Sequence, residues 1–111
     1  MPASALKEPE EYGNNQCELI AKDYQAVYGG SLIWIQSLKP SGAYETGDYS
    51  AHVINKVYDK EHGVYYIDYK AKTIMYNLNT VSNWYYESTK KQSQIWDLST
   101  SRPGFNLIWH Y

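Results

Sequence analysis

The chain has very little cysteine: Cys17 is the only residue of this type among 111. A lone thiol cannot form an internal disulfide, and thiolate metal sites need several cysteines. A disulfide-stapled small domain and a cysteine-rich metal centre are therefore excluded. A reducing compartment is compatible with the sequence.

Long hydrophobic runs and clusters of positive charge are also missing. The apolar stretches, such as residues 32–35, are far shorter than a membrane span, and residues 1–11 lack the basic and apolar regions of a signal peptide. The ten basic residues are scattered, with Lys90 and Lys91 as the only adjacent pair, and the net charge is −2. We therefore expect neither a membrane nor a nucleic acid as partner.

Tyrosine and tryptophan are abundant, with thirteen and four residues against one phenylalanine. Hydrophobic residues make up 43% of the chain and charged residues 20%, as in ordinary globular proteins. Rings with polar edges cover the cores of small domains and also gather at binding surfaces. Composition predicts one domain and leaves both uses of the aromatic residues open.

The first segment, residues 1–13, is polar, acidic and contains proline, which predicts a flexible leader or the end of a linker. The folded domain is then expected over residues 14–111. Apolar residues recur at three- and four-residue spacing from Cys17 to Tyr28, and two glycines follow, so we expect a helix over about 16–28. Asn14 or Asn15 is the expected cap of this helix.

Strands are expected after this helix. "AHVINKVYD" and "VYYIDYKA" are rich in Val, Ile and Tyr, and "KEHG" between them favours a turn, so the pair predicts an antiparallel hairpin. "SLIWIQSL" fits a helix or a strand, residues 39–50 form a loop, and residues 106–111 are an expected terminal strand. "KTIMYNLN" extends the second strand or starts another, and residues 80–99 are a helix or an irregular return. The class predicted is α+β.

Cys17 at the start of a helix is the candidate nucleophile. Unpaired backbone N–H groups and the positive end of the helix dipole both favour a thiolate at that position. In the hairpin, pairing Val57 with Gly63 sets His52 directly opposite Asp68 on the same face. An aspartate can then hold one ring nitrogen of the histidine and leave the other for the thiol. A small buried cysteine and two ordinary strand-end residues are the alternative interpretation.

The order "NNQC" opening a helix, "SAHVINKV" starting one strand and "VYYIDYKA" ending the next resembles the papain-like cysteine peptidase fold in its minimal bacterial form. It is similar to papain-fold toxin domains of polymorphic, contact-dependent interbacterial toxins and to double-glycine leader peptidases. The resemblance covers about residues 14–72. It implies a nucleophile helix packed on a small antiparallel sheet, with Cys17 as nucleophile, His52 as general base and acid, and Asp68 as orienting carboxylate.

The resemblance further implies the residues around this triad. Gln16, Asn15 and Asn14 are the available side-chain amides for the oxyanion hole, and Gln16 is the preferred donor, beside the N–H of the nucleophile. Asp48 and Tyr49 are expected to line the cleft entrance, where the loop before His52 forms a lip for the substrate. No cofactor and no metal is expected, since Asp59, Glu61 and His62 are explained as polar residues of a turn.

The function implied is cleavage of protein substrates, with small residues such as glycine at the cut bond. The resemblance implies a toxin effector delivered as part of a larger protein, acting in the cytoplasm of a target bacterium and blocked by a cognate immunity protein. The same triad also serves glutamine deamidation, transglutamination and cell-wall amide hydrolysis. A different class, a non-catalytic Tyr- and Trp-rich binding module such as an immunity protein, is the rival prediction.

Overall fold

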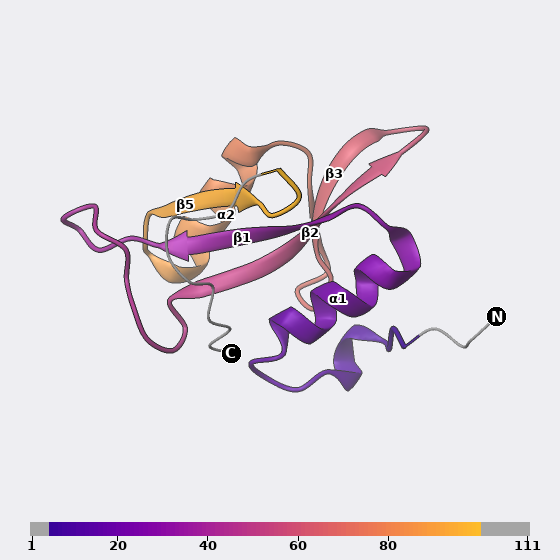
Figure 1. Ribbon diagram of the computed structural model, residues 1–111, viewed down its shortest axis with the longest axis horizontal. Helices are drawn as coiled ribbons and strands as arrows, with labels where there is room; N and C mark the ends of the chain where they lie inside the picture. The colour runs from indigo at the N-terminus through magenta and orange to yellow at the C-terminus, as the bar shows by residue number, and fades with distance from the viewer. Residues whose placement is uncertain (1–4, 101–111) are drawn as a thin grey trace.

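The computed structural model describes residues 5–100, which form an α+β domain with a five-stranded antiparallel sheet between two helices (Figure 1). The elements follow in the order α1 (Cys17–Tyr28), β1 (Ser31–Ser37), β2 (Ala51–Asp59), β3 (Gly63–Asp68), β4 (Thr73–Met75), α2 (Leu78–Thr89) and β5 (Ser93–Asp97). The sheet order is β4-β3-β2-β1-β5. The α+β class is therefore confirmed, and the expected terminal strand at 106–111 lies outside the described residues.

Helix α1 confirms the expected helix, but its cap differs from the expectation. Gln16 occupies the cap position and makes no side-chain cap bond, because its amide oxygen accepts the Gly13 N–H at 2.9 Å. Gly29 and Gly30 end the helix with φ of +73° and +80°. These are values that residues with a side chain rarely adopt.

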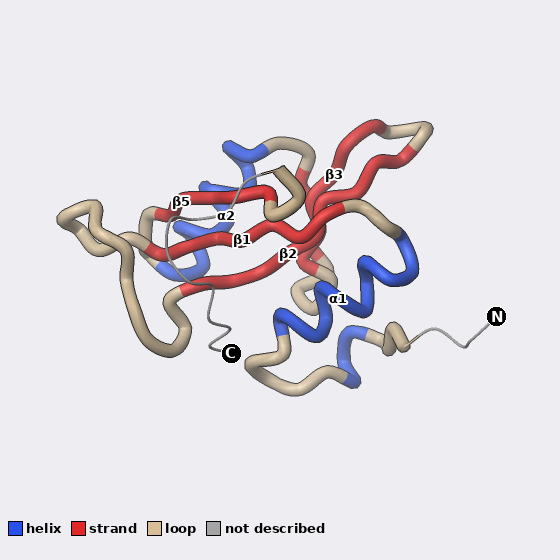
Figure 2. The backbone as a smooth tube through the Cα atoms, in the orientation of Figure 1, coloured by secondary structure: helices blue, strands red, loops and turns tan. Residues whose placement is uncertain are grey.

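The apolar run "SLIWIQSL" forms strand β1, which lies inside the sheet between β2 and β5 (Figure 2). One face, with Ile33 and Ile35, packs with Val81 and Tyr85 of α2. On the other face, Trp34 packs with the helix α1. A strand buried on both faces does not alternate between apolar and polar residues. Its sequence therefore lacks the two-residue period that distinguishes a strand from a helix.

The hairpin of β2 and β3 has a register two residues away from the predicted one. Val57 lies opposite Tyr65 rather than Gly63, and Gly63 lies opposite Asp59. A three-residue turn with Gly63 at φ +78° closes the hairpin, and the Asp59 carboxylate accepts the N–H of Glu61 at 2.9 Å. A shift of two keeps every side chain on its predicted face, because the side-chain period of a strand is two.

The N-terminal segment packs on the domain over part of the predicted flexible leader. Leu6 contacts the cluster of Tyr24, Val57 and Ile67, and Tyr12 is only 2% exposed. A short 3-10 helix, Pro9–Glu11, lies beside α1 (Figure 2). The expected boundary before Asn14 therefore moves back, because apolar residues of this segment add to the core; residues 1–4 lie outside the described part.

We expect Gly30→Ala to destabilise the protein more than Gly29→Ala. A Cβ at Gly30 would lie 2.0 Å from the Lys56 carbonyl oxygen in β2, whereas a Cβ at Gly29 meets nothing within 4 Å. Backbone strain alone predicts a loss of about 1–3 kcal/mol in the free energy of unfolding for Gly29→Ala. Urea unfolding of both variants measures the difference, and equal losses would contradict the close approach.

Candidate active site

Cys17, His52 and Asp68 all line one cleft of about 360 Å³. Cys17 begins α1, His52 is the second residue of β2, and Asp68 ends β3. The cleft therefore lies where the start of the helix meets the ends of two neighbouring strands. A cleft of this size is in the range of ligand sites.

His52 and Asp68 form a hydrogen bond of 2.7 Å between the ring Nε2 and the carboxylate Oδ2. Asp68 is two residues short of the position directly opposite His52, so the contact crosses the strands diagonally. The direct opposition expected from the sequence is thus wrong in register, but the two side chains meet because they share a face. The Asp68 side chain is 9% exposed and that of His52 29%.

The electrostatics of the pair favour a charged imidazole. Burial lowers the pKa of His52, but hydrogen bonds and charge from Asp68 and Cys17 outweigh it and raise the pKa to about 9. Burial raises the pKa of Asp68, but the His52 hydrogen bond and charge, together with backbone N–H groups of Ala71 and Lys70, bring it below its usual value. Carboxylate and imidazolium therefore coexist at neutral pH. With Nε2 bonded to Asp68, Nδ1 is the ring nitrogen left for the Cys17 thiol.

Cys17 is the first residue of α1. The first intrahelical bond runs from the Ile20 N–H to the Gln16 carbonyl, so the N–H groups of residues 17–19 precede the helical ladder. These groups and the positive end of the helix dipole lie at the start of α1, and Cys17 and His52 both line the cleft there. Cys17 is partly exposed, so its sulfur is not sealed in the core.

The other predicted site residues differ in whether they line the cleft. Tyr49 lines the cleft, and Asp48 does not. Gln16 is exposed, its amide oxygen accepts the Gly13 N–H at 2.9 Å, and it is not among the lining residues. Asn14 and Asn15 are the side-chain amides that line the cleft.

Helix α2 supplies a wall of the cleft that sequence reasoning missed. Trp84, Tyr85, Ser88 and Thr89 line it, and the Trp84 ring lies 6.0 Å from the His52 ring between centroids. The pairs 84/88 and 85/89 are four residues apart, so they share one side of a helix. That spacing was the available signal, but the mixed polarity of residues 80–99 left helix and irregular structure undecided.

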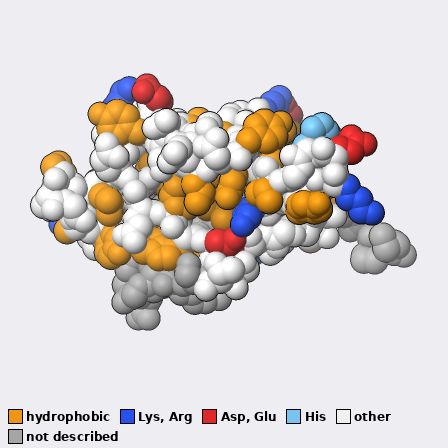
Figure 3. All heavy atoms as spheres, turned by 90° about the horizontal axis from the view of Figure 1, so that it is seen from above, with side chains coloured by type: hydrophobic (Ala, Val, Ile, Leu, Met, Phe, Trp, Pro, Cys, Tyr) orange, Lys and Arg blue, Asp and Glu red, His pale blue; other side chains and the backbone are white. Residues whose placement is uncertain are grey.

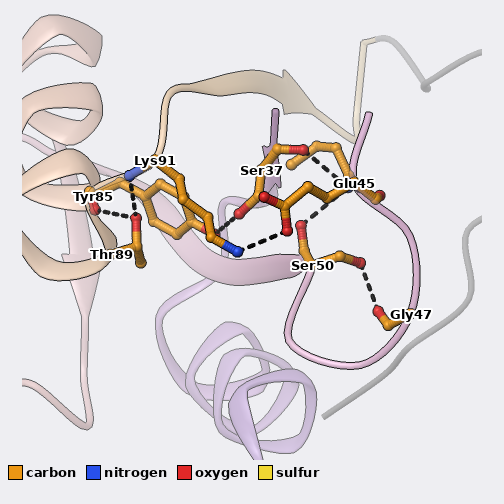
Figure 4. A network of polar contacts seen from close by, with 8 residues as sticks. Ser37, Glu45, Gly47, Ser50, Tyr85, Thr89 and Lys91 are labelled. Atoms are coloured by element: carbon orange, nitrogen blue, oxygen red, sulfur yellow. Dashed lines mark hydrogen bonds and ion pairs between the residues drawn. The ribbon is translucent and has the colours of Figure 1, made fainter. Parts of the chain in front are cut away.

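A buried polar network behind the cleft fixes the loop that carries Tyr49 (Figure 4). The Ser37 hydroxyl bonds to the Tyr85 hydroxyl, and the Ser37 N–H donates to the Ser50 carbonyl at 2.8 Å. The Lys91 ammonium donates to the Glu45 carboxylate at 2.7 Å, which ties the loop to the start of β5. The loop before His52 is therefore held by contacts with β1 and with the segment between α2 and β5.

Neither a metal-binding cluster nor a membrane-spanning helix is found within residues 5–100. Within residues 5–100, no group of three His, Cys, Asp or Glu side chains is arranged to hold a metal ion. In the same range, no helix is long and apolar enough to cross a membrane.

Comparison of the chain with protein-family models, with curated proteins and with solved structures finds no match.

We expect the His52 imidazolium to lose its proton near pH 9 in the folded protein, against 6.5 for an ordinary histidine. Because the folded-state pKa is raised, the charged ring stabilises the fold fully below pH 6.5, and this contribution is lost as the pH rises through 9. Heteronuclear NMR of the ring nitrogens measures the midpoint. Asp68→Asn, which removes the carboxylate charge, should lower the pKa. A wild-type midpoint near 6.5 would contradict the assigned electrostatics.

Proposed function

We propose that the protein is a papain-like cysteine peptidase that cuts amide bonds with Cys17, His52 and Asp68. The observation that carries this proposal is the 2.7 Å bond between His52 and Asp68 in the cleft that Cys17 also lines. Structural histidines are common, but a nucleophile, a base and an orienting carboxylate in one cleft form the set that acyl transfer needs. A nucleophile helix followed by neighbouring His and Asp strands supports the papain-like arrangement.

Acylation begins with attack of the Cys17 thiolate on the carbonyl carbon of the substrate amide. Charge then develops on the carbonyl oxygen, and in this proposal the Cys17 N–H donates a hydrogen bond to that oxygen as part of an oxyanion hole. The His52 imidazolium gives its proton to the departing amine nitrogen as the C–N bond breaks. The product of this half-reaction is a thioester on Cys17 and a free amine.

Deacylation uses the same groups in the reverse sense. Neutral His52 removes a proton from a water molecule, the hydroxide oxygen bonds to the thioester carbon, and the C–S bond breaks. The thiolate leaves as the acid product forms, and His52 again carries the proton. Asp68 keeps the ring in the required orientation and stabilises its charge throughout.

The side-chain donor of the oxyanion hole is assigned here to Asn14 rather than Gln16. Asn14 lines the cleft, whereas the amide oxygen of Gln16 is bound to the Gly13 N–H outside the lining residues. One of the two N–H donors of the Asn15 amide is bonded to the Tyr49 hydroxyl. Asn14 is therefore the amide of this segment best placed to meet a substrate oxygen.

The chemistry of the cleft favours a neutral substrate segment. Its lining charges are Asp68 and the His52 imidazolium, which are bonded to each other, and Lys70, which donates to the carbonyls of Pro9 and Tyr12. Apart from the Cys17 thiol, the remaining lining residues are aromatic, aliphatic, amide, glycine and hydroxyl groups. A protein substrate with small residues such as glycine at the cut bond fits this description, because three aromatic rings, those of Tyr49, Trp84 and Tyr85, border the space.

The biological setting remains a proposal that rests on the resemblance to papain-fold toxin domains. In that setting the domain is delivered with a larger effector into the cytoplasm of a target bacterium. A cognate immunity protein would cover the cleft. Deamidation, transglutamination and cell-wall amide hydrolysis use the same acylation step and differ in which amide is attacked and which nucleophile resolves the thioester.

A binding module is the second candidate, and the exposed aromatic residues favour it. Tyr58 is 70% exposed and Tyr76 62% exposed. In the view of Figure 3, hydrophobic side chains gather across the middle of the surface between charged ones. Exposed tyrosines are common in protein contact surfaces, but they give no reason for a buried carboxylate that orients a histidine beside a thiol.

We expect the wild-type domain to generate new protein N-termini in a bacterial lysate, whereas Cys17→Ala should generate none above background. Removal of the sulfur abolishes the thioester step while changing little of the surrounding packing. Mass spectrometry of labelled N-termini measures the difference, with near-UV circular dichroism to show that the variant is folded.

Two other results would redirect the assignment. A mass increase of 1 Da on glutamine residues, dependent on Cys17, would identify a deamidase in place of a peptidase. Identical lysates with wild type and Cys17→Ala, in N-termini, deamidation and cross-linking, would contradict the enzyme proposal and favour the binding module.

A further inference from the structure

The turn after β3 is tied to the N-terminal segment through Lys70. Its ammonium group donates to the carbonyl oxygens of Pro9 and Tyr12, at 3.1 and 2.6 Å. Hydrogen bonds from a charged donor are stronger than neutral ones. Pro9 is buried and Tyr12 is 2% exposed, so these carbonyls belong to a fixed piece of backbone. Lys70 also lines the cleft, which places this junction beside the triad.

Tyr69 and Lys72, on either side of Lys70, also contact the N-terminal segment, but their contacts differ in how much they contribute to stability. The Tyr69 hydroxyl donates to the Lys7 carbonyl oxygen at 2.8 Å. Lys72 forms an ion pair with Glu10, but both side chains are more than 60% exposed, at 63% and 64%. An exposed pair of this kind contributes little to stability. Lys70 is therefore the charged residue of the turn whose contacts hold the segment.

The same turn determines where the Asp68 carboxylate lies. The Ala71 N–H donates to Asp68 Oδ1 at 3.0 Å, and the Lys70 N–H also bonds to this carboxylate. Oδ2 is the oxygen bound to His52. A displacement of the turn backbone would therefore move the carboxylate away from the ring.

The other end of the N-terminal segment leads directly to the nucleophile. After Tyr12, the Gly13 N–H donates to the Gln16 side chain at 2.9 Å, and Cys17 follows. The Tyr12 hydroxyl donates to Asp23 of α1 at 2.8 Å, which fixes the segment to the nucleophile helix. A continuous series of contacts thus joins Cys17 to Asp68 through the N-terminal segment and Lys70. Asp68 is in turn bonded to His52, which lies beside the Cys17 thiol.

We propose that Lys70 is a positioning residue for the triad, acting through residues 9–12 to fix the distance between the Asp68 turn and the start of the Cys17 helix. This role rests on the proposed function as far as catalysis is concerned. Its structural part, the placement of Asp68 against His52, can be measured without any substrate. Residues 9–12 are then part of the active-site framework, not a spacer before it.

Lys70→Met is the central variant, because it keeps the length of the side chain and removes the donors. We expect the rate of Cys17 alkylation by iodoacetamide at pH 6 to fall by about tenfold or more, since small displacements in an active site have effects of this size. The pKa of His52 should fall from about 9 toward 6.5, because Asp68 is no longer held against the ring. Alkylation is followed by intact mass and the pKa by NMR.

Matched variants separate positioning from general loss of charge. Lys70→Arg also donates to two carbonyls and is expected to retain most of the alkylation rate and the raised pKa of His52. Lys72→Met removes a positive charge two residues away and should behave like wild type. If Lys70→Met does not fold by near-UV circular dichroism, Lys70→Gln, which keeps one donor group, is measured in its place and is expected to show a smaller loss.

The outcomes distinguish the two proposals. Lys70→Met or Lys70→Gln with a wild-type pKa of His52 and a wild-type alkylation rate would overturn the positioning role. A raised pKa of His52 in wild type that falls in Lys70→Met supports the role even if no lysate protein is cut, in which case the peptidase assignment alone fails.

Discussion

The hydrogen bond between His52 and Asp68 is the contact on which the arrangement of the site depends. It brings a carboxylate against an imidazole at the end of the sheet and keeps the ring charged despite its burial. Without the carboxylate, burial would favour a neutral ring with no fixed orientation. The contact requires β2 and β3 to point these two side chains to one face, and requires the turn after β3 to hold the carboxylate. Both the sheet and the turn after β3 are therefore needed for the hydrogen bond between His52 and Asp68.

The remaining architecture supplies the third group and a substrate wall. Helix α1 covers one face of the sheet and starts at Cys17, and α2 covers the other face and presents Trp84 to the cleft (Figure 1). Burial of β1 on both faces makes the sheet a fixed base for these helices. The polar network of Ser37 and Tyr85 then anchors the loop before His52. The site thus lies at one end of the sheet, between α1 on one face and α2 on the other.

Sequence reasoning reached the helix, the hairpin and the pairing of His52 with Asp68 because each follows from local period or from alternation along a strand. It failed on register, because the length of the turn at Gly63 depends on backbone conformation that residue types do not fix. It missed Lys70 and the packing of Tyr12, since contacts between residues 58 positions apart have no local pattern. Gln16 was expected in the cleft for its proximity to Cys17, whereas its side chain bonds to Gly13.

The central claim is that the buried pair makes the Cys17 sulfur a nucleophile, and the pH dependence of its alkylation tests this most directly. The rate constant with iodoacetamide is measured from pH 5 to 10 for wild type and His52→Ala. We predict that wild type reacts at pH 6 much faster than a free thiol such as glutathione, and that His52→Ala loses this excess. A wild-type profile equal to that of glutathione, or one unchanged in His52→Ala, would contradict the account.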